Sequence, residues 1–190
     1  ARIYASAHGV YRLTLNKKRP DQREFAPEFT PYGKCLYYQV YDVKELLTEG
    51  RNVLQMYVGD GWYFSSQAGP VMQDRHKEPS VVIQMELTYE DETSEMILSD
   101  GSETCRTDFI VYLYQGEKQD LTLASGEKKP VMIKDYGYDF LHVQPMEPIL
   151  PIREIPAVEV FTSPAGETIV DFGQVLAGRA RIKIDVPKGQ

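Results

Sequence analysis

The sequence is poor in the residues on which disulfide scaffolds and metal centres depend. It contains two cysteines among 190 residues, Cys35 and Cys105, and no CxxC pair. Each is expected to be a buried free thiol, with a disulfide as the alternative, so the redox compartment stays open. The three histidines, His8, His76 and His142, are far apart and form no ligand motif. We therefore predict no metal site and no cofactor.

Long apolar runs and basic patches are also missing. No stretch of about 18 apolar residues is present, which argues against a transmembrane helix and a membrane partner. Acidic and basic residues are mixed, with a formal net charge of −7, which argues against a nucleic-acid partner. Residues 1–4 enter a strand pattern without an initiator Met or a signal-peptide region. We therefore expect an excised or processed piece of a longer protein.

The motifs of nucleophilic and nucleotide-dependent enzymes are absent as well. The sequence has no GxSxG, SxxK or GxGxxG motif and no phosphate-binding glycine loop. Its 28 acidic residues offer many carboxylate pairs, but their spacing singles out none as the facing pair of a glycosidase. We therefore predict that this chain alone has no catalytic residues.

What the sequence does contain is strand-like alternation. Thirteen Tyr and seven Phe favour β-structure. Strands with one polar face are typical of antiparallel sheets that bury the other face against a second sheet, so we predict an all-β, antiparallel, jelly-roll-like sandwich. Residues 90–92 and 163–166 have the composition of hairpin turns. The alternating segments are residues 11–16, 54–58, 81–89 and 180–186.

One short helical turn interrupts this pattern. Asp42 and Glu45 have the spacing of a capping box, in which the Asp42 carboxylate accepts from the Glu45 amide. Leu46 and Leu47 would dock the turn, and Gly50 would end it. We expect about five to eight residues, too few for a helical layer.

Proline and polar residues suggest where the chain divides. We expect a sandwich domain at residues 1–120, a connecting segment at 121–156 that is proline-rich at its end, and the start of a second β-sandwich domain at 157–190. The last segment is too short to build an independent core. Residues 67–79 are polar and predict a long exposed loop.

The candidate binding site is the segment GDGWY at residues 59–63. Its glycines let the backbone turn and place Trp62 and Tyr63 beside Asp60. Aromatic faces next to a carboxylate can stack on a sugar ring and hydrogen-bond its hydroxyls. The alternative is structural, with Trp62 closing one end of the sandwich and Asp60 capping the turn. The oxygen spacing around Asp60 does not support calcium.

Six motifs occur in order along the chain and together resemble one family. The set resembles the N-terminal region of bacterial α-L-rhamnosidases of glycoside hydrolase family 78. Lys17 and the pair Glu28-Phe29 depart from it, because the family usually has Gly and Gly-Trp there. The motifs are GVYRLTLN at 9–16, APEFTPY at 26–32, YQVYDV at 38–43 with two leucines at 46–47, GRNVL and GDGWY at 50–63, YQGE at 114–117, and DFGQ at 171–174 with Gly178.

The resemblance implies a parent protein that hydrolyses terminal α-L-rhamnosyl linkages with inversion. In that family the catalytic carboxylates lie on a later α/α-barrel domain, so none is carried over to this chain. The partner implied is the catalytic domain of the same parent chain, in a bacterial protein that is either cytoplasmic or exported. We therefore expect a non-catalytic accessory region. The alternatives are an autonomous module that binds rhamnose-containing glycans and, with less support, an enzyme in its own right.

Overall fold

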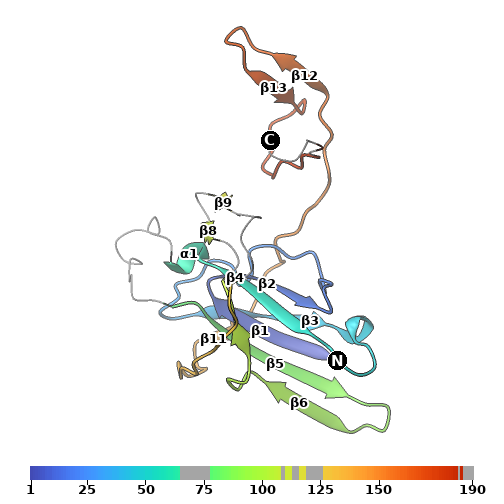
Figure 1. Cartoon of the computed structure of the whole chain (residues 1–190), viewed down its shortest axis with the longest axis vertical. Helices are drawn as coiled ribbons and strands as arrows, with labels where there is room; N and C mark the ends of the chain where they lie inside the picture. The colour runs from blue at the N-terminus through green and yellow to red at the C-terminus, as the bar shows by residue number, and fades with distance from the viewer. Residues whose placement is uncertain (65–77, 108–109, 113–115, 119–125, 184, 186–190) are drawn as a thin grey trace. The chain divides into compact units, whose positions relative to one another are not determined.

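In a computed structural model, the chain divides into two compact units, residues 1–151 and 152–190 (Figure 1). Most of the loop predicted at residues 67–79, including His76, lies outside the residues that the structure describes. Only residues 78 and 79 of this loop are described. No helix in the described part of the chain has the length and apolar character needed to cross a bilayer. The described residues are 1–64, 78–107, 110–112, 116–118, 126–183 and 185.

The main sheet of the first unit has five strands in the spatial order β11, β3, β1, β5, β6. Neighbours are antiparallel except β11 and β3, which are parallel. The hairpin predicted at residues 90–92 is confirmed, because it joins β5 to β6. β11 lies within residues 121–156, so part of that segment is a strand of this sheet. The bounds are β1 (Arg2–His8), β3 (Leu36–Asp42), β5 (Ser80–Thr88), β6 (Ser94–Leu98) and β11 (Leu141–Val143).

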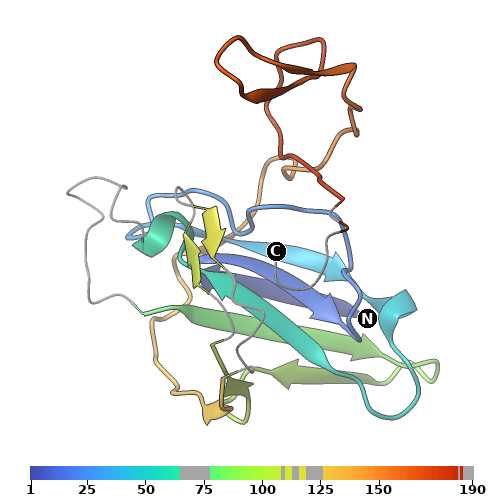
Figure 2. The same cartoon turned by 45° about the horizontal axis from the view of Figure 1, so that its top comes forward.

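A second layer consists of β2 (Val10–Leu15) and β4 (Leu54–Gly59), which pair antiparallel. In Figure 2 the teal strand β4 crosses the face of the main sheet. Alternate residues of β1 and β2 meet between the layers, because successive strand residues point to opposite faces. The predicted all-β sandwich is confirmed, and each buried Leu or Ile contributes about 1.5–3 kcal/mol. Its buried apolar core is Ile3, Ala5, Ala7, Tyr11, Leu13, Leu15, Ala26, Tyr41, Val43 and Met85.

The helical turn after β3 is shorter than predicted, a 3₁₀ turn η1 (Lys44–Leu46). The Asp42 carboxylate accepts from the Lys44 amide at 3.1 Å, not from Glu45, so the capping box is wrong. The reason lies one residue later, where Val43 is fully buried and its amide donates to the Ala1 carbonyl. The backbone hydrogen bonding between the first and third strands therefore extends to Val43, and the helical turn begins only at Lys44.

The remaining elements of the first unit are short. Cys35 is partly exposed and Cys105 exposed, so the expected burial is wrong, although both thiols are free as predicted. Cys105 belongs to a two-residue strand whose residues are exposed. The elements are α1 (Gly61–Phe64), β7 (Thr104–Cys105) paired with β10 (Lys129–Pro130), and β8 (Ile110–Tyr112) paired with β9 (Gly116–Lys118).

The second unit contains one hairpin, β12 (Glu159–Thr162) and β13 (Thr168–Asp171), joined at the predicted turn 163–166. The strand expected at 180–186 is not formed by its described residues, 180–183 and 185. A strand requires a hydrogen-bonded neighbour, and β12 and β13 pair only with each other. None of the described residues of this unit is buried.

Candidate functional site

Two glycines shape the turn that carries the candidate site. Gly61 has a φ of +54°, and a Cβ at this position would collide with Val10. Gly9 has a φ of +131°, and a Cβ there would contact the carbonyl oxygen of Gly59 at 2.5 Å. Only glycine allows these backbones to approach so closely. The chain therefore leaves β4 and enters α1 at once, which places Trp62 and Tyr63 on that short helix.

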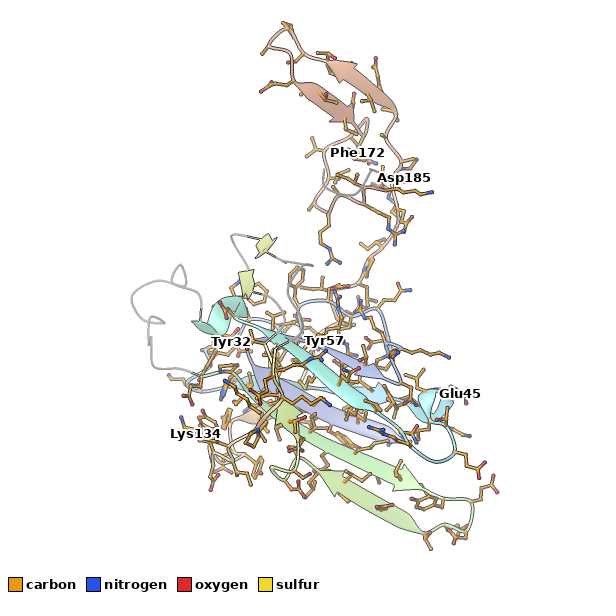
Figure 3. The ribbon with its side chains drawn as sticks, viewed as in Figure 1. Tyr32, Glu45, Tyr57, Lys134, Phe172 and Asp185 are labelled. Carbon is orange, nitrogen blue, oxygen red and sulfur yellow. The ribbon has the colours of Figure 1, made fainter. Side chains whose placement is uncertain are left out.

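Tyr63 belongs to the interior of the unit. Its side chain is 7% exposed, and its ring stacks on that of His8 with centroids 4.3 Å apart. The ring of Tyr32, which lies close to α1 (Figure 3), meets Tyr63 edge-on at 5.4 Å. His8 is itself buried, and its Nδ1 is 2.8 Å from the hydroxyl oxygen of Ser80. Tyr63 thus anchors α1 to the interior of the first unit.

Trp62 reaches the surface beside two phenylalanines. It is partly buried, and its ring lies 6.0 Å from that of Phe25 and 6.2 Å from that of Phe29, the latter in an edge-to-face arrangement. Phe29 is 55% exposed. We call Phe25, Phe29 and Trp62 the aromatic surface. Sequence reasoning missed the two phenylalanines, because only the fold brings residues 25–29 beside α1.

Asp60 lies between β4 and α1 and is partly buried. Desolvation by this burial raises the pKa of its carboxyl group, because a low-dielectric environment disfavours the charged form. Within the part of the chain that the structure describes, no cluster of three or more His, Cys, Asp or Glu residues is arranged to hold a metal ion.

The loop that carries Phe29 is tied to the main sheet through Glu28. The carboxylate of Glu28 is buried and accepts a hydrogen bond of 2.7 Å from Nε2 of Gln144. Oε1 of Gln144 in turn accepts from Nε2 of Gln39 at 3.1 Å. The hydroxyl of Tyr32 donates to the carbonyl of Glu28 at 3.3 Å. The motifs at residues 26–32, 38–43 and 59–63 therefore meet at one end of the sandwich.

Known proteins with similar sequences are α-L-rhamnosidases. The chain is 30% identical over its full length to an α-L-rhamnosidase of Streptomyces avermitilis and covers 20% of that relative. It is 28% identical, again over its full length, to an α-L-rhamnosidase of Formosa agariphila, of which it covers 22%. The chain thus spans about one fifth of the length of these relatives.

A solved structure agrees with the sequence comparisons. The Streptomyces avermitilis α-L-rhamnosidase complexed with L-rhamnose superimposes with a TM-score of 0.76 and 28% identity over 91% of this chain and 18% of that one. The family model of the α-L-rhamnosidase N-terminal domain matches residues 1–159, which include the sandwich and the aromatic surface. The chain therefore belongs to the family of α-L-rhamnosidase N-terminal domains.

Proposed function

We propose that this chain is the non-catalytic N-terminal region of a longer α-L-rhamnosidase, which hydrolyses terminal α-L-rhamnosyl linkages with inversion on a separate catalytic domain. The observation that carries the proposal is the match of residues 1–159 to the N-terminal domain of that family, together with coverage of about one fifth of the relatives. The role of the region is to pack against the catalytic domain and support it.

The exposed apolar residues of the second unit favour such a supporting role. Val160 and Val170 face each other across the hairpin and are 61% and 46% exposed. Phe161 and Ile169 form the next pair and are 43% and 37% exposed. Each face of this hairpin therefore carries an exposed apolar pair, which favours a surface that another part of a protein covers. The hairpin is, in this proposal, the start of a second β-sandwich domain.

Activity measurements on the isolated chain and on the longer polypeptide test this proposal. The longer polypeptide should release p-nitrophenol from p-nitrophenyl α-L-rhamnopyranoside, and the isolated chain should release none. Deleting residues 1–151 from the longer polypeptide should lower its thermal midpoint. Release of p-nitrophenol by the isolated chain would show that it carries its own catalytic site, and an unchanged midpoint would argue against support.

A second function, sugar binding, is favoured by the aromatic surface. Trp62 is the only Trp of the chain, and Phe29 beside it is 55% exposed, so two rings are placed where a pyranose could stack. In this proposal Trp62 contacts the sugar, Asp60 accepts from its hydroxyls, and Tyr63 holds α1 in place. L-rhamnose is the probe suggested by the family.

Isothermal calorimetry and Trp62 fluorescence test sugar binding directly. L-rhamnose should release or absorb heat on binding and should quench or shift the emission of Trp62. Trp62→Ala should abolish the heat, whereas Tyr57→Ala, at an exposed position on β4, should leave it unchanged. No heat with L-rhamnose or rhamnosides at millimolar concentration would rule out this function.

A further inference from the structure

The loop that carries Phe29 holds two residues in a conformation that side chains seldom adopt. Phe25 has a φ of +58° and Glu28 a φ of +73°. Residues other than glycine are uncommon in this left-handed region and persist there where the surrounding contacts impose it. Phe25 and Phe29, the two residues of this loop that contact Trp62, are therefore part of a backbone under constraint.

The carboxylate of Glu28 supplies one such contact. It is 8% exposed and accepts from Gln144, which is bonded to Gln39. Gln39 is 1% exposed, and its Oε1 accepts from the hydroxyl of Tyr11 at 2.6 Å. A hydrogen-bond chain thus runs from the loop into the middle of the sandwich. Burying a carboxylate is unfavourable unless it is paired or hydrogen-bonded, so Glu28 is anchored at this point.

The anchor lies next in sequence to the most exposed ring of the aromatic surface. Phe29 follows Glu28 and meets both Trp62 and Tyr32 edge-on, at 6.2 Å and 6.0 Å. Glycine adopts a positive φ without help, whereas glutamate needs contacts that hold it there. The contacts of the Glu28 side chain therefore hold a backbone conformation that glycine would adopt without them.

We propose that Glu28 is a positioning residue: its carboxylate, held by Gln144, fixes the ring of Phe29 beside Trp62, and the two rings together contact the apolar face of a 6-deoxyhexose. The sugar contact rests on the sugar-binding function proposed above. The positioning of Phe29 beside Trp62 does not depend on it and is tested separately.

Fluorescence of Trp62 tests the positioning in the full chain. Glu28→Ala should shift the Trp62 emission to longer wavelength and raise its quenching by acrylamide, because Phe29 would no longer be held beside the indole. Gln144→Ala removes the hydrogen-bond donor to the Glu28 carboxylate and should produce the same two changes in Trp62 fluorescence. Glu28→Gln keeps an acceptor oxygen for Gln144 and should resemble the wild type. Glu45→Ala, an exposed acid on η1 (Figure 3), is the matched control.

Circular dichroism identifies variants that remain folded. A folded Glu28→Ala or Gln144→Ala chain with the emission and quenching of the wild type would overturn the positioning role. A Glu28→Gln chain as perturbed as Glu28→Ala would also overturn it, because the hydrogen bond would then not be what holds the loop. If Glu28→Ala does not fold, Gln144→Ala decides.

Calorimetry with L-rhamnose tests the sugar contact. Glu28→Ala should bind at least about tenfold more weakly than the wild type, which corresponds to about 1.4 kcal/mol, and Glu28→Gln should bind like the wild type. Equal affinity of the wild type and Glu28→Ala would overturn the contact between Phe29 and the sugar. If the wild type shows no heat, the sugar-binding function fails, and the fluorescence of Trp62 alone decides the role of Glu28.

Discussion

At the scale of single residues, this chain places ordinary side chains at backbone positions with a positive φ, which glycine adopts more readily. Glu28 is one case, and Lys17 is another. Asn16 and Lys17 form a two-residue turn with φ values of +52° and +66°, closed by reciprocal hydrogen bonds between Leu15 and Lys18. This is the geometry of a type I′ hairpin turn, for which Asn-Gly is the preferred sequence. Lys17 therefore keeps a strained backbone at a position that glycine fits without strain.

Lys17→Gly should stabilise the chain by about 0.5–1 kcal/mol, because the gain from relieving a left-handed lysine exceeds the extra flexibility of glycine in the unfolded state. Urea unfolding followed by circular dichroism measures the change. Lys18→Gly, at a neighbouring residue without a positive φ, is the control and should not stabilise. A Lys17→Gly chain no more stable than the wild type would show that the turn is not strained.

At the scale of secondary-structure elements, a buried polar network joins the two layers of the sandwich. The hydroxyl of Tyr11 on β2 lies 3.0 Å from the carbonyl of Ala5 on β1 and 2.6 Å from Oε1 of Gln39 on β3, and it accepts from Tyr41 at 3.0 Å. Burial raises the pKa of Tyr11 well above its usual value, and the neighbouring Tyr41 raises it further. Burial is also the main cause of the raised pKa of Tyr41. The network is therefore stable only with both phenols protonated.

Stability should consequently fall in alkaline solution. The pKa in the folded state lies above that of the unfolded chain, about 10, so the stabilisation is fully present below pH 10 and is lost as the pH rises through the folded-state pKa. The free energy of unfolding should decrease by up to about 1.4 kcal/mol per pH unit for each tyrosine. Urea unfolding at about pH 8, 10 and 11 measures this loss. Tyr11→Phe should lose less stability above pH 10, and an identical pH profile would contradict the assignment.

Local sequence patterns predicted strands better than they predicted where chain segments meet. The alternation at residues 11–16 and 81–89 and the turns at 90–92 and 163–166 correspond to strands and hairpins of the structure. The alternation at 180–186 did not produce a strand, because pairing needs a neighbour that periodicity does not reveal. The sequence did not point to Phe29 for a similar reason, since its contact with Trp62 joins a loop to the helix α1, 33 positions away in sequence.

At the scale of the whole molecule, the two units differ in what holds them together. Both hydrophobic clusters, including Tyr32, Leu36 and Tyr63 in the smaller one, consist of residues before position 152. The second unit is one hairpin with no buried residue among those described, and an isolated hairpin is marginally stable in water. The stability of the chain is therefore expected to come from residues 1–151.

A chain of residues 1–151 should accordingly unfold at nearly the same temperature as the 190-residue chain. The expected difference is less than about 4 °C, the shift that roughly 1 kcal/mol produces in a domain of this size. Amide hydrogen exchange should be fast in β12 and β13 and slow in β1, β2 and β3. A much lower thermal midpoint for residues 1–151, or protected amides in the hairpin, would assign stability to the second unit.

The parallel pairing of β11 with β3 has a consequence for synthesis of this protein. β3 ends at Asp42, but its neighbour on that side begins only at Leu141, so the strand stays open at one edge while the intervening residues are translated. Contacts between segments so distant in sequence slow folding. Until residue 143 has left the ribosome, the nascent chain offers an unpaired strand edge to chaperones and to neighbouring nascent chains.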